Sequence, residues 1–293
     1  MRNNAHSIYT FDFSTLYTKI PHDKLKSVMR ELINFCFKGG ENKYIAVNKF
    51  GARWVKEKNP NMTVFDKTSL KLAINFLLDN CFFRVGNLIF RQVIGIPMGT
   101  DPAPFMANLF LYFYENKWAT ELRKKDLWKA RLFSNTFRFI DDLCALNDKG
   151  EFEKCCSEIY PPELELKKEN LCDQSASFLD LEIFVNRNKF ETKLYDKRDA
   201  FPFQIVRMPY SDSNIPTKIF YASISSEILR LAKTTSTLAA FINSSNTLLK
   251  RMKCQGSKSL STKKLLRKLY NQHPDNFKKF ANNAAVFVSL FNI

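Results

Sequence analysis

Glycine is scarce in this sequence, and glycine-rich loops are missing. The chain has 8 glycines among its 293 residues, whereas average usage of roughly 7% would supply about twenty. No glycine-rich loop of the kind that binds phosphates or a dinucleotide occurs. Long apolar runs are also absent, since the longest nearly apolar stretch, residues 102–114, is shorter than the ~20 residues that span a bilayer. A dinucleotide-binding enzyme and a membrane-spanning protein are therefore both disfavoured.

Metal-binding cysteine pairs are absent too. The seven cysteines include no CxxC pair, and the three histidines are isolated, so the spacing of a zinc site does not occur. Scattered cysteines of this kind are typical of reduced thiols that pack in the core of an intracellular protein. We therefore expect a reducing intracellular compartment, with the nucleus as one candidate.

Acidic residues are scarce in the last third of the chain. Residues 198–293 carry 15 basic and 4 acidic side chains, whereas residues 1–197 carry 30 basic and 25 acidic ones. The whole chain has a net charge of +16, which favours a polyanionic partner, nucleic acid before an anionic membrane. The change in charge predicts a boundary between two domains, residues 1–197 and residues 198–293.

The spacing of apolar residues predicts an α+β body followed by a helical tail. The predicted strands are residues 8–13, 82–85, 88–93, 136–140, 143–146, 164–167, 178–185 and 189–195. The predicted helices are residues 23–37, 66–79, 104–125 and 151–159, followed by a largely helical segment from residue 216 onward. Asp23 is the expected N-cap of the first helix. Residues 39–63 show no clear period and are expected to be irregular.

Three aspartates interrupt apolar strands. Asp12 lies in a Phe-Asp-Phe segment, and Asp141 and Asp142 follow a Phe-Arg-Phe-Ile segment. A carboxylate in apolar surroundings needs a compensating cation or hydrogen bonds, and converging carboxylates call for a divalent metal ion. Successive strand residues point to opposite faces, so one of the paired aspartates, Asp141, is favoured as the main ligand. Alternatively, Asp12 is an ordinary strand-end residue and the Asp-Asp pair is an ordinary hairpin turn.

Four segments that include these residues resemble motifs A, B, C and E of reverse transcriptases, in that order. They are FDFSTLYTKIPHDKL from residue 11, GIPMGTDPAPFMANLFLYFYE from residue 95, FRFIDDLCALND from residue 137 and SFLDLEIFV from residue 177. The wording is closest to Penelope-like retroelements, whose polymerases are similar to telomerase. Motif C departs from the common aromatic-x-Asp-Asp form only in having Phe139 in place of tyrosine.

The resemblance implies the fold and the activity of a right-hand polymerase. The palm, an antiparallel sheet with helices, would occupy residues 1–197, with partial fingers insertions at about 39–95, and an all-helical thumb would occupy residues 198–293. The implied enzyme is a nucleotidyltransferase of retrotransposon origin, an RNA-directed DNA polymerase. It would add dNTPs to a DNA primer on an RNA template.

The same resemblance implies a two-metal site. Asp12 and Asp141, with Asp142 as a lesser partner, would hold two Mg²⁺ ions, for which Mn²⁺ is a substitute. In such a site one ion lowers the pKa of the primer hydroxyl, and the other neutralises the triphosphate. Lys167 and Lys168 are both candidates to protonate the departing pyrophosphate, and neither is required by the sequence.

Further residues match positions that contact substrates in this family. Tyr17 matches the residue under the incoming sugar, where an aromatic ring excludes a 2′-hydroxyl. Glycines in motif B permit positive φ and a close approach of the backbone to the nascent base pair. The expected substrate-binding residues are Phe13, Tyr17, Gly95, Pro97, Met98 and Gly99, and the expected primer grip is Phe178, Leu179 and Asp180. A core aromatic at position 17 and a plain turn in motif B are the alternatives.

Basic residues in the tail are expected to follow the backbone of an RNA–DNA hybrid, a contact that does not depend on sequence. The expected contacts are Arg207, Arg230, Lys250, Arg251, Lys263, Lys264, Arg267 and Lys268. Ordinary protein surfaces mix both signs of charge. The near absence of acidic residues therefore favours nucleic-acid binding over a merely solvated helix surface.

Eleven residues precede Asp12, so we expect the fingers region that comes before motif A to be missing. Polymerisation by this chain alone is therefore an open question. A truncated, non-catalytic remnant that binds nucleic acid is the alternative function. A telomerase-like enzyme or an RNA-templated RNA polymerase ranks third, because Tyr17 disfavours ribonucleotides. The sequence leaves the oligomeric state open.

Overall fold

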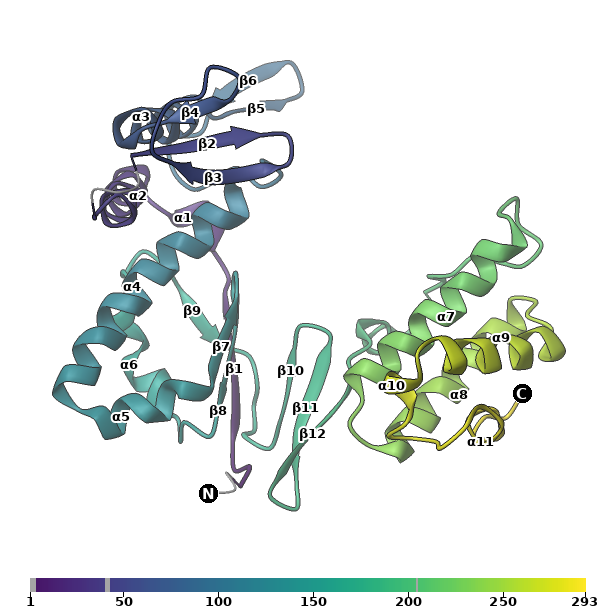
Figure 1. Cartoon of the computed structure of the whole chain (residues 1–293). Helices are drawn as coiled ribbons and strands as arrows, with labels where there is room; N and C mark the ends of the chain where they lie inside the picture. Colours follow the sequence, from purple (N-terminus) through teal and green to yellow (C-terminus); the bar gives the residue numbers. More distant parts are fainter. Residues whose placement is uncertain (1–3, 40–42, 204) are drawn as a thin grey trace. The chain divides into compact units, whose positions relative to one another are not determined.

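The structure of the chain is a computed structural model that describes residues 4–39, 43–203 and 205–293. The chain divides into two units, which we call the sheet unit (residues 11–169) and the helical unit (residues 1–10 and 170–293). Figure 1 shows the strands and helices of both. The residue 197/198 boundary predicted from charge lies inside the helical unit.

A four-stranded sheet with the order β7-β8-β1-β9 forms the centre of the sheet unit (Figure 1). Its strands are β1 (Ile8–Phe13), β7 (Thr136–Phe139), β8 (Asp142–Leu146) and β9 (Leu166–Lys168). β7 pairs with β8 and β1 pairs with β9, both antiparallel. Two segments that are more than 100 residues apart in the sequence therefore lie side by side in one sheet.

The helices of the sheet unit follow the predicted pattern closely. They are α1 (Leu16–Lys19), α2 (His22–Cys36), α3 (Lys67–Asp79), α4 (Ala103–Lys125), α5 (Leu127–Leu132), α6 (Glu151–Ile159) and the 3₁₀ turn η1 (Phe133–Asn135). Asp66 and Ser69 form a capping box at the start of α3, which explains why this helix begins where the sequence predicted. The predicted cap of α2 is wrong: Pro21 occupies the N-cap, and Asp23 lies in the first turn.

Residues 39–63, which were expected to be irregular, contain strands instead. β2 (Tyr44–Asn48), β3 (Gly51–Val55) and β4 (Thr63–Phe65) form an antiparallel sheet with the order β3-β2-β4. Ala46 is the fully buried residue of β2, whereas most of β3 is exposed. A sheet with so few buried side chains has no strong alternation of apolar and polar residues. This explains why its strands were not predicted from the sequence.

The hairpin of β5 (Phe82–Val85) and β6 (Leu88–Arg91) turns at Gly86, as predicted. All eight strand residues are exposed. The pairs Phe83–Phe90 and Val85–Leu88 lie on one face, and the two phenylalanine rings stack with centroids 5.6 Å apart. This face is therefore apolar and open to water in the chain as described.

The helical unit combines a small sheet with a helical bundle. Its elements are β10 (Ser175–Phe178), β11 (Leu181–Asn186), β12 (Lys189–Leu194), η2 (Lys197–Ala200), α7 (Thr217–Thr234), α8 (Leu238–Cys254), α9 (Ser259–Gln272), α10 (Pro274–Phe277) and α11 (Ala284–Ser289). The sheet has the order β10-β11-β12. The predicted hairpin is thus the larger part of a three-stranded meander, and the predicted helical tail is confirmed.

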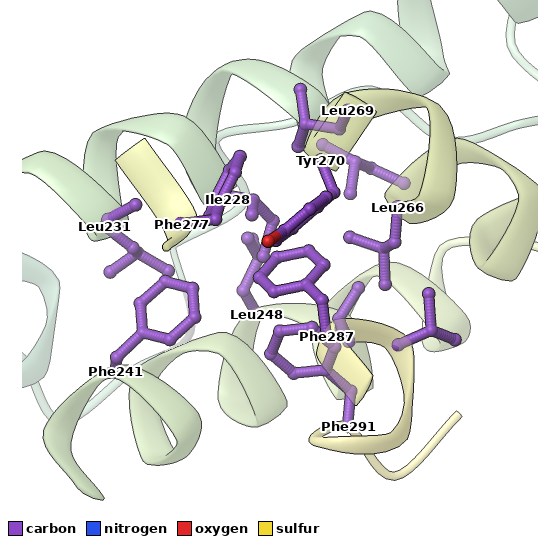
Figure 2. Packing of buried hydrophobic residues seen from close by; sticks show 14 of the residues in the cluster. Ile228, Leu231, Phe241, Leu248, Leu266, Leu269, Tyr270, Phe277, Phe287 and Phe291 are labelled. Atoms are coloured by element: carbon purple, nitrogen blue, oxygen red, sulfur yellow. The ribbon is translucent and has the colours of Figure 1, made fainter. Parts of the chain in front are cut away.

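The core of the bundle is rich in aromatic rings (Figure 2). Phe241 of α8 stacks on Phe280 with a centroid separation of 4.2 Å and nearly parallel planes. Phe287 of α11 packs against Phe277 at 4.6 Å and against Tyr270 at 5.5 Å. The Tyr270 hydroxyl donates to the Ala281 carbonyl oxygen, so its one polar atom is satisfied within the core. Phe241 also lies 6.3 Å from Phe287, so aromatic contacts join α8, α9, α10 and α11 through their buried faces.

All seven cysteines are unpaired, and two of them, Cys144 and Cys155, are buried. Burial raises the pKa of the Cys144 thiol to about 12, and the charge of Asp148 adds to this. The other five are partly or fully exposed, so core packing accounts for only part of the set. Within the described ranges, no helix combines the length and the apolar character needed to cross a membrane.

The aromatic core predicts a large difference between two leucines of α9. Leu266 is 0% exposed and Leu260 is 75% exposed. Leu266→Ala should lower the free energy of unfolding by about 2–5 kcal/mol, because it leaves a cavity in the core, whereas Leu260→Ala should change it by less than about 0.5 kcal/mol. Urea unfolding followed by far-UV circular dichroism measures both. Equal effects of the two substitutions would contradict the packing described.

Candidate active site

The two faces of the central sheet have different environments. Phe11 packs against Phe152 of α6 with ring centroids 5.1 Å apart, and Phe13 packs edge-on against Tyr160 at 4.8 Å. Both phenylalanines are 2% exposed. Because side chains alternate along a strand, Asp12 points to the opposite face, which we call the open face. The apolar residues of β1 thus direct its carboxylate away from α6.

Asp142 shares the open face with Asp12. Arg138 pairs with Leu143, and both line a cavity together with Phe152 of α6, so these two lie on the α6 side. Alternation then places Asp142, next to Leu143, on the open face. Asp142 begins β8 and pairs with Phe139, so it is a strand residue rather than the turn residue that the sequence suggested.

Asp141 lies in the two-residue turn between β7 and β8, close to Asp12. Its carbonyl oxygen accepts a hydrogen bond from the Phe13 amide at 3.1 Å, which ties the turn to β1 next to Asp12. Burial raises the pKa of Asp12 above its ordinary value, the Asp141 carboxylate raises it further, and the Lys167 ammonium lowers it. Two like charges near one another in partly buried positions attract a cation.

The two candidate lysines lie on opposite faces of the sheet. Lys167 is the partner of Asp12 in the β1–β9 register, and Lys168 is the partner of Phe11. Lys168 forms an ion pair of 2.7 Å with Glu153 of α6. Lys167 lies on the open face and also approaches Glu165 at 3.3 Å. Of the two lysines, Lys167 is therefore the one that the sheet brings to the aspartates.

Tyr17 and the motif B loop meet beside the aspartates. Burial raises the pKa of the Tyr17 hydroxyl, and the charge of Asp141 adds to this, so the phenol lies within electrostatic range of the turn. The Tyr17 carbonyl oxygen accepts from the Ile96 amide at 2.7 Å, and the Gly95 amide donates to the Ile20 carbonyl oxygen at 2.8 Å. These bonds fix the loop to the segment that follows β1.

Gly95 is required at its position by two independent constraints. Its φ is +80°, and a Cβ built there would overlap the Tyr17 carbonyl oxygen. Gly99 also has a positive φ, of +95°, but a Cβ there meets nothing within 4 Å. Motif B therefore uses its first glycine for a close approach of two backbone segments and its second glycine for conformation alone.

The remaining predicted substrate-binding residues are placed differently from one another. Met98 is 72% exposed and Pro97 is half-buried, so the motif B loop presents side chains to solvent. The Phe13 side chain, in contrast, is buried against Tyr160 on the α6 side. Phe13 reaches the site through its backbone, because its amide bonds to Asp141.

Two residues near the site were not singled out by the motifs. His22 at the start of α2 bonds through Nε2 to the Gly95 carbonyl oxygen at 2.7 Å; since a carbonyl only accepts, Nε2 carries the proton. Arg138 of β7 donates to the carbonyl oxygen of Ile140 in the turn at 3.1 Å. The signal for Arg138 is a cation inside an apolar strand, Phe-Arg-Phe-Ile, which requires polar partners.

The donor set of the open face fits Mg²⁺ in part. Asp12 and Asp141 supply two neighbouring carboxylates, and Mg²⁺ in phosphate-transferring sites takes one or two carboxylates and completes its shell with phosphates and water. Across residues 4–39, 43–203 and 205–293, no group of three or more His, Cys, Asp or Glu side chains is arranged to hold a metal ion. Asp12 and Asp141 are therefore the two residues that would hold such an ion.

The predicted primer grip forms the turn between β10 and β11 in the helical unit. Leu179 has a φ of +54°, and the Asp180 carbonyl oxygen accepts from the Tyr195 amide at 2.8 Å. The Asp180 carboxylate pairs with Arg230 of α7 at 3.0 Å, and Arg230 also bonds Glu227 at 3.2 Å. Arg230 thus holds the turn against α7, in addition to being a predicted phosphate contact.

The predicted nucleic-acid contacts differ in how exposed their charges are. Arg251 approaches Asp196 at 3.3 Å, and Asp196 also binds Arg198, which together hold the pKa of this carboxyl at about 2. Arg207 and Lys250 are exposed. The four basic residues of α9 are all exposed, and they are Lys263, Lys264, Arg267 and Lys268. Because the opposite side of α9 buries Leu266 and Leu269, this helix presents a cationic face to solvent.

No protein-family model and no curated protein matches this chain. Among solved structures, telomerase from Candida albicans in complex with the TWJ fragment of telomeric RNA matches with a TM-score of 0.56 at 11% identity, over 96% of this chain and 47% of that one. Apo telomerase from Candida tropicalis matches with a TM-score of 0.46 at 11% identity, over 99% of this chain and 49% of that one. The chain thus spans about half the length of the telomerase chains it matches. The first likeness shows a shared fold of antiparallel sheets and helices.

The two glycines of the motif B loop allow a matched test of the close contact between Gly95 and the Tyr17 backbone. Gly99→Ala should lower the free energy of unfolding by about 1 kcal/mol, because alanine is strained at positive φ. Gly95→Ala should cost at least about twice as much, because it adds a steric clash with the Tyr17 backbone to the same strain. Chemical denaturation of the two variants and the unaltered chain gives the comparison. A smaller loss for Gly95→Ala than for Gly99→Ala would show that the loop does not contact Tyr17.

The raised pKa of Asp12 predicts how stability depends on pH. The pKa of Asp12 is higher in the folded chain than in the unfolded chain. The free energy of unfolding therefore falls as pH rises from the unfolded-state pKa to the folded-state pKa, because deprotonation is less favourable in the folded chain. Asp12→Asn should therefore be more stable than the unaltered chain at pH 7, and the difference should vanish below the ordinary value of 3.8. Mg²⁺ at pH 7 should reduce the difference. The exposed Asp101→Asn serves as the control, and a difference for Asp12→Asn that is the same at every pH would contradict the electrostatic coupling.

Proposed function

We propose that this chain is the palm and thumb of an RNA-directed DNA polymerase, which adds dNTPs to a primer 3′-hydroxyl. The observation that carries the proposal is the convergence of Asp12 and Asp141 on the open face of an antiparallel sheet, with Tyr17 within electrostatic range. The four ordered motifs and the fold shared with telomerase support it. The sheet unit corresponds to the palm, and the bundle in the helical unit to the thumb.

The chemistry of nucleotidyl transfer matches the residues of the open face. When bound, Mg²⁺ would supply charge stabilisation for the attacking and leaving oxygens, and Asp12 and Asp141 would hold it, with Asp142 as a lesser partner. Lys167 lies opposite Asp12 in the register, where its ammonium can give a proton to the departing pyrophosphate. This proton neutralises charge that develops on the leaving group.

Nucleotide selection would depend on Tyr17 and the motif B loop. The ring of Tyr17 excludes a 2′-hydroxyl if the sugar lies over it, which favours deoxynucleotides. The exposed Met98 and the half-buried Pro97 would form the surface under the nascent base pair, and the bonds of Gly95 to the segment after β1 keep that surface fixed. A retroelement origin of the Penelope-like kind rests on the amino-acid sequences of the motifs.

A specific observation favours nucleic-acid binding as a second candidate function. The exposed cationic face of α9 carries four basic side chains, which suits the phosphate backbone of an RNA–DNA hybrid. Binding of this kind needs none of the aspartates. A chain that binds hybrids without incorporating nucleotides would be the non-catalytic remnant.

Primer extension on an RNA template with Mg²⁺ and dNTPs tests the proposal. The chain is assayed alone and with a reverse-transcriptase fingers segment joined before residue 1. At least one form should extend the primer, and Asp141→Asn should reduce the rate by about 100-fold or more, because it removes several kcal/mol of charge stabilisation. The matched control is Glu121→Gln, an exposed position on α4, which should leave the rate unchanged.

Two outcomes would overturn catalysis by this site. Extension by neither form, together with salt-dependent binding to an RNA–DNA hybrid, would establish the binding remnant in its place. Extension by Asp141→Asn at the unaltered rate would show that another site performs the chemistry.

A further inference from the structure

The side chain of Arg138 lies at the centre of a polar network on the α6 side of the sheet. Its Nε and Nη2 donate to the two carboxylate oxygens of Glu115 on α4, at 2.6 and 3.0 Å. Its Nη1 donates to Asn108 Oδ1 at 2.7 Å. The Tyr160 hydroxyl donates to the same Glu115 carboxylate at 2.8 Å. A paired, planar guanidinium with several charge-assisted bonds has a defined orientation.

The same guanidinium reaches the turn that carries Asp141. Nη1 of Arg138 also donates to the Ile140 carbonyl oxygen at 3.1 Å. Ile140 has a φ of +55°, a region that β-branched residues rarely adopt and that persists only where the surroundings impose it. The Ile140 carbonyl oxygen belongs to the peptide group that leads directly into Asp141, so this bond bears on the position of the Asp141 backbone.

The Arg138 side chain is held by hydrogen bonds although a cavity lies beside it. Arg138 and Glu115 line a cavity of about 290 Å³ together with Trp118, Phe133 and Tyr160. The Arg138 side chain is nevertheless only 12% exposed. With open space on one side, the guanidinium is held by its polar partners on α4 and in the turn.

We propose that Arg138 is a positioning residue for the candidate active site. Clamped by Glu115, it holds the strained turn at Ile140 and thereby places the Asp141 carboxylate beside Asp12. The role in catalysis rests on the proposed function, whereas the role in holding the turn stands on the contacts alone. Arg138 lies on the opposite face of the sheet from Asp12, so it acts through the turn.

The Phe13 amide reports on the turn directly, because it donates to the Asp141 carbonyl oxygen at 3.1 Å. In Arg138→Met, hydrogen exchange of this amide should become about tenfold faster or more, since the turn opens locally. Arg138→Lys keeps a charge but cannot bind Glu115 and Ile140 together. Its Phe13 exchange rate should lie between those of Arg138→Met and the unaltered chain. Arg131→Met, at an exposed arginine on α5, should leave exchange at Phe13 unchanged.

Kinetics in the primer-extending form separates positioning from general stability. Arg138→Met should lower kcat by about 10- to 100-fold through misplacement of Asp141, with KM for the dNTP nearly unchanged. Glu115→Gln, which keeps the shape of the partner, should shift kcat and Phe13 exchange in the same direction by less. Unchanged Phe13 exchange in a folded Arg138→Met or Arg138→Lys variant would overturn the proposal. If neither the chain alone nor the chain joined to a fingers segment extends a primer, the proposed function fails, and the exchange comparison still decides the role of Arg138.

Discussion

The alternation of side chains along β1 organises the sheet unit. Phe11 and Phe13 pack beneath α6, against Phe152 and Tyr160. Because side chains alternate along a strand, Asp12 must point to the opposite face. The register with β9 then separates Lys167 from Lys168 in the same way. A one-residue slip of β1 would exchange the two faces and bury the carboxylate beneath α6. The position of the charged groups is therefore a consequence of where the rings pack.

Backbone carbonyl oxygens are the acceptors that anchor the loop segments around the aspartates. The Tyr17 carbonyl oxygen receives the Ile96 amide, the Asp141 carbonyl oxygen receives the Phe13 amide, and the Ile140 carbonyl oxygen receives Arg138. Each bond joins segments that are distant in the sequence except the last, which closes the turn on its own strand. The loop framework beneath the open face is thus fixed by bonds to backbone carbonyl oxygens, and none of these bonds uses the carboxylates of Asp12 or Asp141.

The elements with a strong apolar period were predicted from the sequence. Features that depend on contacts between residues distant in the sequence were not. The long helix α4, the strands around the Asp-Asp pair and the helical tail follow from apolar spacing, and the aspartates stood out because charge interrupts apolar strands. The register that selects Lys167 over Lys168 depends on pairing between β1 and β9, more than 150 residues apart, which no local pattern encodes. β2 and β3 were missed because little of their surface is buried. The bonds of Glu115 to Arg138 and Tyr160 were not predicted, since they join residues that are 23 and 45 positions apart.

The hairpin of β5 and β6 exposes a surface through which copies of the chain can associate. A two-stranded sheet is marginal in water by itself, and here Phe83, Val85, Leu88 and Phe90 leave one face exposed. Among the described residues, neither strand pairs with a third strand. Such a surface favours edge-to-edge association between copies as concentration rises. This apolar face is therefore one place where copies of the chain can associate despite a net charge of +16, and lysine in place of Phe83 and Phe90 would put like charges there.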